Sequence, residues 1–474
     1  MKKLFILFTL VSLMFSSCQE FESNTKFVRK NIHSPEAQSD VDAMNKALQS
    51  MRKLDCSNPL SWYYQGAIHW IPDTIKDNKL CNSYKNISDK KDGWDNCTHS
   101  HTSVDEVNFL VWHRLYIWHF EKIVRKLSGK KDFALPYWGY TNKGTENLTL
   151  HQSFIDKSSS LYESSRFDSL NQGCPMEGEI QRTFNLSKLM SYTDFQLFAS
   201  NIDRAPHGAI HDYVGHGNDY NDGKLWFDNS ITGTKTHDGL MGWVPTAAFD
   251  PVFWTHHSNI DRIWQQWSNS ANGRPITVEM LKQNPWSYAF FDENGKKVVY
   301  TPEQIIDIIY SLDYDFDDCQ VRPVTNPVLV KSSKRNKVSQ KVGLDVNSQI
   351  TDAITIKSPV SSTGQFPGKV EIEVEVSFTD LPRGVYEVYV NHNKSIEPNP
   401  SNNSFVGFMT FFGQDHKSSG TVCLNGCCTP LINGRPSMKF KFQVDQSSEY
   451  NFIIYKHNGN HSGDLRIENI NILF

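Results

Sequence analysis

The segment Phe249–Arg262, which reads FDPVFWTHHSNIDR, places two adjacent histidines in an apolar, aromatic run. On a helix, His257 and Asp261 are four residues apart and therefore share one face. A carboxylate in that position can accept the free ring N–H of a metal-bound histidine, which strengthens the other nitrogen as a ligand. His207 and His211 have the same four-residue spacing. Three imidazoles from the two segments predict one metal site between helices.

Apolar residues at helical spacing predict further helices. We expect them over Pro35–Lys53, Tyr63–His69, Glu106–Leu127 and Asp250–Trp267, with others beginning near Tyr192, at Pro206 and at Thr301–Pro302. The Glu106–Leu127 stretch is apolar on almost every side, which predicts a helix buried all round. It carries His113 in its middle, while His69 ends the preceding helix. Loops are expected over 76–93, 141–191 and 241–245.

The composition changes between residues 321 and 348, where two prolines and the basic run Lys331–Lys341 predict a linker. Beyond it the apolar residues alternate, most strictly over Lys369–Phe378, which predicts β-strands. Further strands are expected at Val385–Val390, Met438–Val444, Tyr450–Tyr455 and Arg466–Phe474. We therefore expect a multidomain α + β protein. Its mainly α-helical domain spans 35–320, and a small antiparallel β-sandwich or barrel follows over 349–474.

The N-terminus has the form of a targeting segment. Lys2 and Lys3 precede the apolar run Leu4–Phe15, which two serines and Cys18 then close. Such a run is too short to span a membrane stably and resembles a secretory signal. A cysteine after small residues predicts bacterial lipoprotein processing: residues 1–18 are the signal, Cys18 is the lipidated first mature residue, and 19–34 form a tether. The alternative is an ordinary signal with an incidental cysteine. Either reading exports the protein, and the first anchors it to the cell envelope.

Overall composition excludes two classes of protein. Over 474 residues the net charge is -4, so nucleic acid is not an expected partner. Charged residues make up 21% and aromatic residues 12% of the chain, which is typical of a globular protein rather than a disordered one. Eight further cysteines could form disulfides in an oxidising compartment, with a connectivity that spacing does not give.

Two sets of three histidines stand out among the 17 in the chain. One set is His69, His99 or His101, and His113; the other is His207, His211 and His257. Two such sets on helices indicate a binuclear centre inside a helix bundle. Imidazole ligands without a carboxylate favour a pair of copper ions over zinc or iron pairs. Taken alone, the His207–His211 spacing is common and has no metal-binding meaning.

These segments resemble the tyrosinase and catechol oxidase family of type 3 copper proteins, which includes molluscan haemocyanins. Asp250-Pro-Val-Phe-Trp-x-x-His257-x3-Asp261 is similar to the family's second copper signature. Phe109-Leu-Val-Trp-His113-Arg114 resembles the first, and the stretch from Asn58 to His69 resembles the segment holding the first ligand. The resemblance covers about Pro35 to Cys319, and the tail resembles the family's C-terminal β-domain.

By this resemblance the first copper takes His69, His99 and His113, and the second takes His207, His211 and His257. His256 would then be structural. Thirteen residues separate His99 from His113, against eight in the family, which implies an insertion around 102–107. His99 is preferred over His101 because Cys97-Thr-His99 resembles the Cys-x-His that forms a thioether in plant and fungal members. The alternative puts Cys97 in a disulfide and uses His101.

The resemblance implies oxidation of o-diphenols, small phenolic substrates, to o-quinones, with O2 as co-substrate. Gly208 and Asp203 stand at positions that help deprotonate monophenols in the family, and glycine cannot hold a water molecule. We therefore expect weak monophenol hydroxylation. Val244 stands at the family's gate position. The β-domain is expected to shield the site. The alternatives are an o-aminophenol oxidase on the same scaffold and a haemocyanin-like oxygen carrier.

Overall fold

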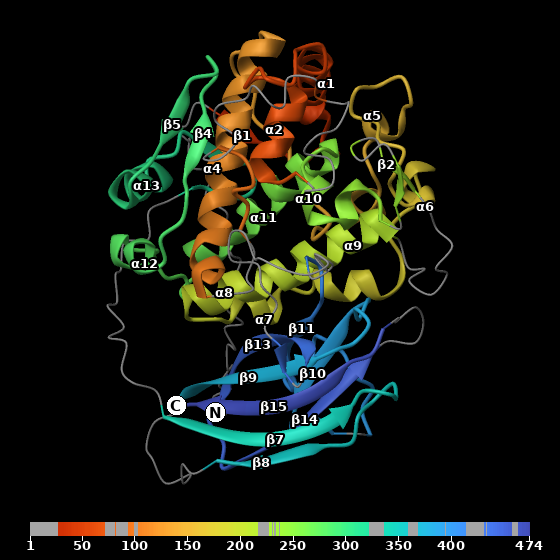
Figure 1. Cartoon of the computed structure of the whole chain (residues 1–474), viewed down its shortest axis with the longest axis vertical. Coiled ribbons are helices and arrows are strands. Elements are labelled where there is room, and N and C mark those ends of the chain that lie inside the picture. The colour runs from red at the N-terminus through yellow and green to blue at the C-terminus, as the bar shows by residue number, and fades with distance from the viewer. Residues whose placement is uncertain are drawn as a thin grey trace, which may run out of the picture.

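The computed structural model of the chain has a helical part and a β-domain, here residues 336–474, which lies below the helices in Figure 1. The structure describes residues 27–71, 81, 93–98, 103–216, 227–229, 231, 234–236, 238–321, 336–358, 368–393, 395–413, 431–432, 434–456 and 463–474. Cys18, His99, His101, most of the expected 76–93 loop and most of the expected linker therefore lie outside the described residues.

The described helices and helical turns all precede the β-domain. In chain order they are η1 (Pro35–Ala37), α1 (Gln38–Met51), α2 (Trp62–His69), α4 (Ser103–Ser128), η4 (Thr145–Leu148), α5 (Gln152–Ile155), α6 (Asp168–Asn171), η5 (Gly178–Phe184), α7 (Ser187–Met190), α8 (Phe195–Ile202), η6 (Asp203–Gly208), α9 (Ala209–His216), η7 (Leu240–Gly242), α10 (Val244–Ala247), α11 (Pro251–Asn269), α12 (Val278–Gln283) and α13 (Pro302–Ile309). The expected loop at 241–245 is thus two short helices, because Pro245 fits the first turn of α10.

Helices α4 and α11 form the centre of the helical part. Helix α4 packs against α1, α8 and α11, and its middle is buried on all sides as its apolar composition predicts. Gly129 ends it with a φ of +78°, which glycine adopts without strain. Helix α11 begins at Asp250, whose side chain accepts the backbone N–H of Val252 at 2.9 Å. Asp250 is held in turn by the buried Arg166.

Six short strands belong to the helical part: β1 (Phe27–Arg29), β2 (Phe227–Asn229), β3 (Thr234–Thr236), β4 (Ala289–Phe291), β5 (Lys297–Val299) and β6 (Tyr314–Phe316). Strand β1 pairs in parallel with β6, and its Arg29 is fully buried between the carboxylates of Glu121 and Asp261. Residues 27–34 of the tether expected over 19–34 are therefore folded structure, because Arg29 is held by an internal ion-pair network.

The β-domain contains β7 (Lys337–Asp345), β8 (Ile354–Lys357), β9 (Lys369–Ser377), β10 (Tyr386–Val390), β11 (Phe405–Met409), β12 (Leu431–Ile432), β13 (Arg435–Asp445), β14 (Glu449–Lys456) and β15 (Arg466–Leu473). One antiparallel sheet has the order β12-β13-β9-β15-β7, and the other has β11-β10-β14-β8. Buried residues of both sheets, such as Val374 and Ile454, form one core. This is the expected sandwich. Strand β7 begins inside the expected 321–348 linker. It pairs antiparallel with β15 and forms the edge of its sheet.

Polar contacts join the β-domain to the helical part. Arg182 on η5 forms an ion pair with Glu387 on β10. Lys441 on β13 binds the carboxylate of Glu106 at 2.8 Å. The hydroxyl of Tyr192 donates to a backbone carbonyl of β11 at 3.0 Å. These contacts show that the β-domain and the helical part share an interface.

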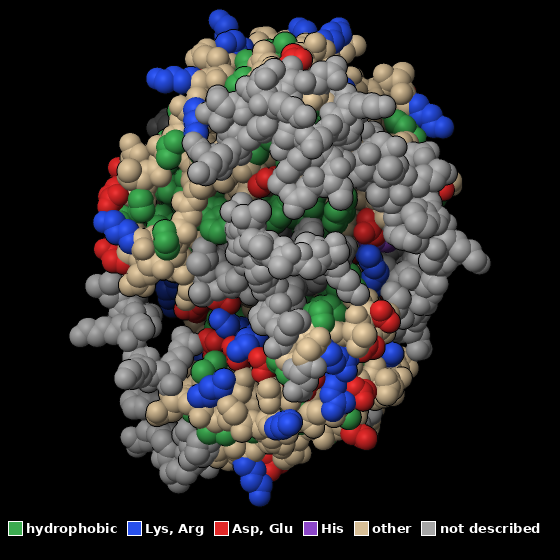
Figure 2. Space-filling model, viewed as in Figure 1, with side chains coloured by type: hydrophobic (Ala, Val, Ile, Leu, Met, Phe, Trp, Pro, Cys, Tyr) green, Lys and Arg blue, Asp and Glu red, His purple; other side chains and the backbone are tan. Residues whose placement is uncertain are grey.

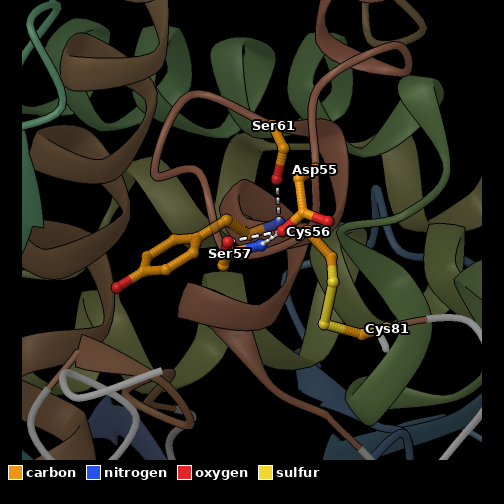
Figure 3. The surroundings of a disulfide bond; sticks show 6 residues. Asp55, Cys56, Ser57, Ser61 and Cys81 are labelled. Carbon is orange, nitrogen blue, oxygen red and sulfur yellow. Dashed lines mark hydrogen bonds between the residues drawn. A yellow bond between two sulfur atoms is a disulfide. The ribbon is translucent and has the colours of Figure 1, made fainter. Parts of the chain in front are cut away.

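A disulfide joins Cys56, which precedes α2, to Cys81 (Figure 3). Next to it, Asp55 accepts the backbone N–H of Ser57 at 2.9 Å, and Ser61 caps α2 by accepting the N–H of Tyr64 at 3.0 Å. These bonds fix the start of α2 and hence the position of the histidine at its end.

On the face seen in Figure 2, basic and acidic side chains are interspersed over the β-domain. This mixture agrees with the small net charge of -4. Within the part of the chain that the structure describes, no helix combines the length and apolar character that crossing a bilayer requires.

Candidate metal centre

The first group of candidate ligands lies between α2 and α4. His69 is the last residue of α2 and is buried. Phe249 can approach α2 closely because position 66 is glycine: a Cβ there would lie 2.6 Å from the phenyl ring. In the middle of α4, the Nδ1–H of His113 donates to the carbonyl of Phe109 at 2.8 Å, which leaves Nε2 as the ligand atom.

Cys97 completes this group. Its sulfur lies 3.6 Å from Nε2 of His113, and one donor atom each of His69, Cys97 and His113 lies within 4.8 Å of the others. Cys97 is buried and forms no disulfide among the described residues. The disulfide alternative for Cys97 is therefore not realised there. The expected thioether and the choice between His99 and His101 lie outside the described residues.

The second group comes from η6, α9 and α11. Ala205 is extended, which interrupts the helical path just before His207. The Nδ1–H of His207 donates to the backbone carbonyl of Asp203 at 3.1 Å, and Oδ1 of the same residue lies 2.9 Å away. His211 donates from Nδ1 to the carbonyl of Met241 at 2.9 Å. One nitrogen each of His207, His211, His256 and His257 lies within 4.8 Å of the others.

The two groups are in contact. The ring of His257 stacks on that of His113, with centroids 4.3 Å apart and an angle of 8° between the planes. His113 and His207 lie 6.3 Å apart, centroid to centroid. The structure therefore brings the buried side chains of His69, His113, His207, His211 and His257 close together.

The chemistry of this centre fits a metal. Burial, followed by the neighbouring histidines, lowers the pKa of His256 and of His257 well below 6.5, so both rings are neutral. Both ring nitrogens of His257 are buried and have no hydrogen-bond partner in the structure. A buried imidazole without a partner is costly unless something binds it. Neither group includes a carboxylate donor, which favours copper, as argued from sequence.

The expected contact between Asp261 and His257 does not form. The carboxylate of Asp261 instead accepts hydrogen bonds from Arg29, Arg114 and Tyr314. Two guanidinium groups attract the carboxylate more strongly than a neutral imidazole can. Asp261 therefore anchors α11 to β1, α4 and β6, and acts on the centre by holding the helix that carries His257.

The three candidate pocket residues are all buried, but in different surroundings. Asp203 lies behind His207 and binds its Nδ1. Val244 opens α10. Gly208 faces the β-domain: a Cβ there would lie 3.2 Å from the Cβ of Phe412 and 3.3 Å from Oγ1 of Thr410.

Sequence reasoning missed the residues that the β-domain places on the centre. Phe412, just after β11, stacks on the ring of His211 with centroids 4.3 Å apart. Thr410 donates its hydroxyl to the carbonyl of Arg204 at 2.8 Å. In Figure 1, β11 and β13 are labelled on the side of the β-domain that faces the helices, and β11 contacts η6 and α7. No local pattern marks these residues, because their partners lie far away in the sequence.

Comparison with known proteins finds a family model that matches the part of the chain containing the centre. Residues 59–188 and 165–270 match the common central domain of tyrosinase. A tyrosinase of Hahella sp. is 28% identical over 277 residues, which are 54% of this chain and 56% of that protein. Aureusidin synthase of Antirrhinum majus is 26% identical over 364 residues, covering 66% of this chain and 61% of that protein. The matched part thus spans less than two thirds of either relative.

Solved structures match over more of the chain. A latent aurone synthase (polyphenol oxidase) has a TM-score of 0.62 at 19% identity and covers 94% of this chain and 90% of its own. A latent apple tyrosinase has a TM-score of 0.62 at 17% identity, covering 94% and 96% respectively. Both show that the helical part and the β-domain together form a known fold.

Proposed function

We propose that the chain is a copper-dependent oxidase of the tyrosinase family, which converts o-diphenols to o-quinones with O2. The observation that carries the proposal is the contact between the two buried histidine groups, through His113 and His257. Two metal ions in those groups would share one small space. The overall reaction balances: two catechols give up two electrons each and reduce one O2 to two waters.

Two copper ions would be held in a bundle of four helices. The first would bind His69 and His113 with a third ligand from His99 or His101, and the second would bind His207, His211 and His257. Copper supplies the redox chemistry with O2, while the protein supplies orientation and a dry site. The aromatic rings of Phe109 and Phe253 pack within 5 Å of His113, His207 and His257 and exclude water.

The preference for diphenols rests on what surrounds His207. A monophenol must lose a proton before it is hydroxylated, and a base with a water molecule would be needed nearby. Asp203 is engaged with Nδ1 of His207, and Gly208 has no side chain to hold water. We therefore propose weak monophenol hydroxylation. Val244 is small and would leave the entrance open to bulky phenols once the β-domain moves.

We further propose that the β-domain keeps the enzyme latent. The ring of Phe412 lies against His211, where an aromatic substrate would have to approach the second copper. Cleavage between 322 and 335 should allow the β-domain to dissociate and raise activity. Unchanged activity after a clean cut would contradict this role.

Two other functions use the same centre. An o-aminophenol oxidase would oxidise 2-aminophenol faster than catechol. A haemocyanin-like carrier would bind O2 reversibly without forming quinone. We favour the diphenol oxidase because the relatives that match this chain include a tyrosinase and polyphenol oxidases.

The deciding experiment uses copper-loaded protein cut in the 322–335 segment. We expect about two coppers per chain by metal analysis and faster quinone formation from catechol than from tyrosine or 2-aminophenol. His113→Ala should lose copper and activity. The matched control is His392→Ala, which removes a histidine of the β-domain that bonds only Ser404 and a backbone carbonyl. Protein that retains no copper would contradict the proposal.

For its location, we propose that the protein is a lipoprotein of a bacterial cell envelope, anchored through Cys18. Mass spectrometry of mature protein from the native host should find an acyl group on an N-terminal Cys18. An unmodified cysteine there would leave only export by an ordinary signal.

A further inference from the structure

The described structure begins at the end of the helical part that lies away from the β-domain. Helix α4 runs between these two ends (Figure 1). Near its start, Glu106 binds Lys441 of the β-domain, and its 26 residues make a helix about 39 Å long. In its last turn, the guanidinium of Arg125 lies over the ring of Phe27, 3.4 Å from the centroid. The chain therefore enters the fold beside the far end of α4.

A lipid anchor at Cys18 would hold this end of the molecule close to a membrane. Eight residues lie between Cys18 and Phe27. A chain of that length reaches at most about 30 Å when it is fully extended. The tether limits the distance to the bilayer but does not orient the protein. The face that meets the bilayer depends on the surface around the end of α4.

Lysines gather around that end of the helix. Lys126 lies in the last turn of α4, and Lys130 and Lys131 follow it in the sequence. Lys46 of α1 donates to the carbonyl of Ser128, the last residue of α4, at 2.7 Å. In Figure 2, basic side chains gather at the upper end of the face shown, away from the β-domain. Lys46, Lys126, Lys130 and Lys131 are called the α4-end lysines below.

Most of the charge of the α4-end lysines is not balanced by carboxylates. Lys46 donates to a backbone carbonyl, and Lys126 donates to the side-chain oxygen of Asn294 at 2.9 Å. Both acceptors are neutral. Lys131 is exposed and forms no ion pair within the described residues. Lys130 alone is balanced, by Asp132 at 2.9 Å and by a second carboxylate, that of Asp40, at 3.2 Å.

We propose that the α4-end lysines dock the protein on the anionic phospholipid headgroups of the membrane that holds its anchor. The inference rests on the proposed lipid anchor at Cys18 and deepens it, because the tether sets the distance and the lysines set the face. Lysines are attracted to an anionic bilayer within about 8 Å at physiological ionic strength. In this orientation the β-domain points away from the bilayer, so it can leave the metal centre without meeting the membrane.

The test measures how the unacylated mature chain, residues 19–474, sediments with lipid vesicles. We expect binding to vesicles that contain phosphatidylglycerol and none to pure phosphatidylcholine, and the binding should fall as salt is added. Lys126→Gln combined with Lys131→Gln should weaken it about 25-fold, since each lysine contributes about fivefold. The matched control is Lys337→Gln with Lys341→Gln, which removes two exposed lysines from β7 of the β-domain and should bind as the wild type does.

Amine-reactive labelling of the protein on phosphatidylglycerol vesicles gives a second measurement. Mass spectrometry should find Lys131 protected by the vesicles and Lys337 labelled as in solution. Equal labelling of the two, or vesicle binding that survives the loss of Lys126 and Lys131, would overturn the docking surface and leave the anchor standing. Salt-sensitive binding through these lysines, in a protein whose native form carries no acyl group on Cys18, would support the docking surface and remove the anchor.

Discussion

The phenyl ring of Phe412 stacks on the imidazole of His211, with centroids 4.3 Å apart and planes inclined by 12°. The two residues come from different parts of the molecule, the β-domain and helix α9. The same phenyl ring lies 6.0 Å from His207. The β-domain thus places an apolar ring against two expected ligands of one metal, and most predictions on activity depend on this contact.

Phe412→Ala should activate the uncut enzyme. An aromatic pair contributes about 1 kcal/mol beyond the area that it buries, so its loss should raise the open population, and the rate of catechol oxidation, at least about fivefold. Steady-state kinetics on full-length protein measures the effect. Phe411→Ala is the control, because Phe411 packs inside the β-domain core instead. It should lower the melting temperature, and equal activation by both variants would contradict a specific cover.

Gly208→Ala should loosen the same cover. The new Cβ would lie 3.2 Å from that of Phe412 and 3.1 Å from the carbonyl oxygen of Asp203, which is closer than nearly all carbon contacts. We expect activation of the uncut enzyme because the β-domain segment must move away. In a Phe412→Ala background the same change should add little, since contacting residues are not additive. Full additivity in the double-mutant cycle would rule out a steric cause.

Asp203→Ala should weaken the second metal. Its carboxylate lies 2.9 Å from Nδ1 of His207, beside the backbone carbonyl of Asp203 that accepts from the same nitrogen and remains in the variant. Losing the carboxylate should therefore cost metal affinity near the lower end of the about 10–100-fold typical of such partners. Copper competition with a chelator measures the change. Asp203→Asn keeps an acceptor oxygen and should restore part of the affinity. If affinity is unchanged while hydroxylation of monophenols disappears, Asp203 acts as a base instead.

The elements that sequence predicted well are those with a strong local period. Apolar residues at helical spacing predict α1, α4 and α11. Alternating apolar residues predict β9 and β13. The sequence of strand β7 resembles a linker because the strand lies at a sheet edge, where its side chains are exposed or only partly buried and need not be apolar. His207 and His211 are recognisable as candidate ligands because they lie one helical turn apart.

Long-range contacts could not be predicted in the same way. Asp261 shares a helical face with His257, yet its carboxylate forms an ion pair with Arg29. Arg29 lies in β1, more than 200 residues before Asp261 in the sequence. Phe412 lies just after β11, in a part of the tail for which the sequence pattern predicts no element. In both cases the tertiary fold brings the contacting residue close, Arg29 to Asp261 and His211 to Phe412. The spacing of residues along the sequence therefore does not predict either contact.

Glu179 should make the cover sensitive to pH. It lies on η5 against the β-domain, where it accepts the backbone N–H of Val385 at 3.3 Å. Its pKa is raised from 4.5 to about 7, mainly by burial and also by Glu387, against the opposing effects of the Val385 N–H and Arg182. The folded protein therefore keeps this proton over a range in which the unfolded chain has lost it. The stabilising contribution is complete below pH 4.5, declines as the pH rises, and is lost above about 7.

Because the ionised carboxylate faces Glu387 across the interface, the contact between the two parts should weaken as the pH rises through 7. Activity and protease sensitivity of the uncut protein should both increase over that range. Glu179→Gln should abolish the increase, since the amide does not ionise, whereas Glu177→Gln alters an exposed neighbour and should retain it. Superimposable pH profiles of wild type and Glu179→Gln would show that the interface titrates through another group.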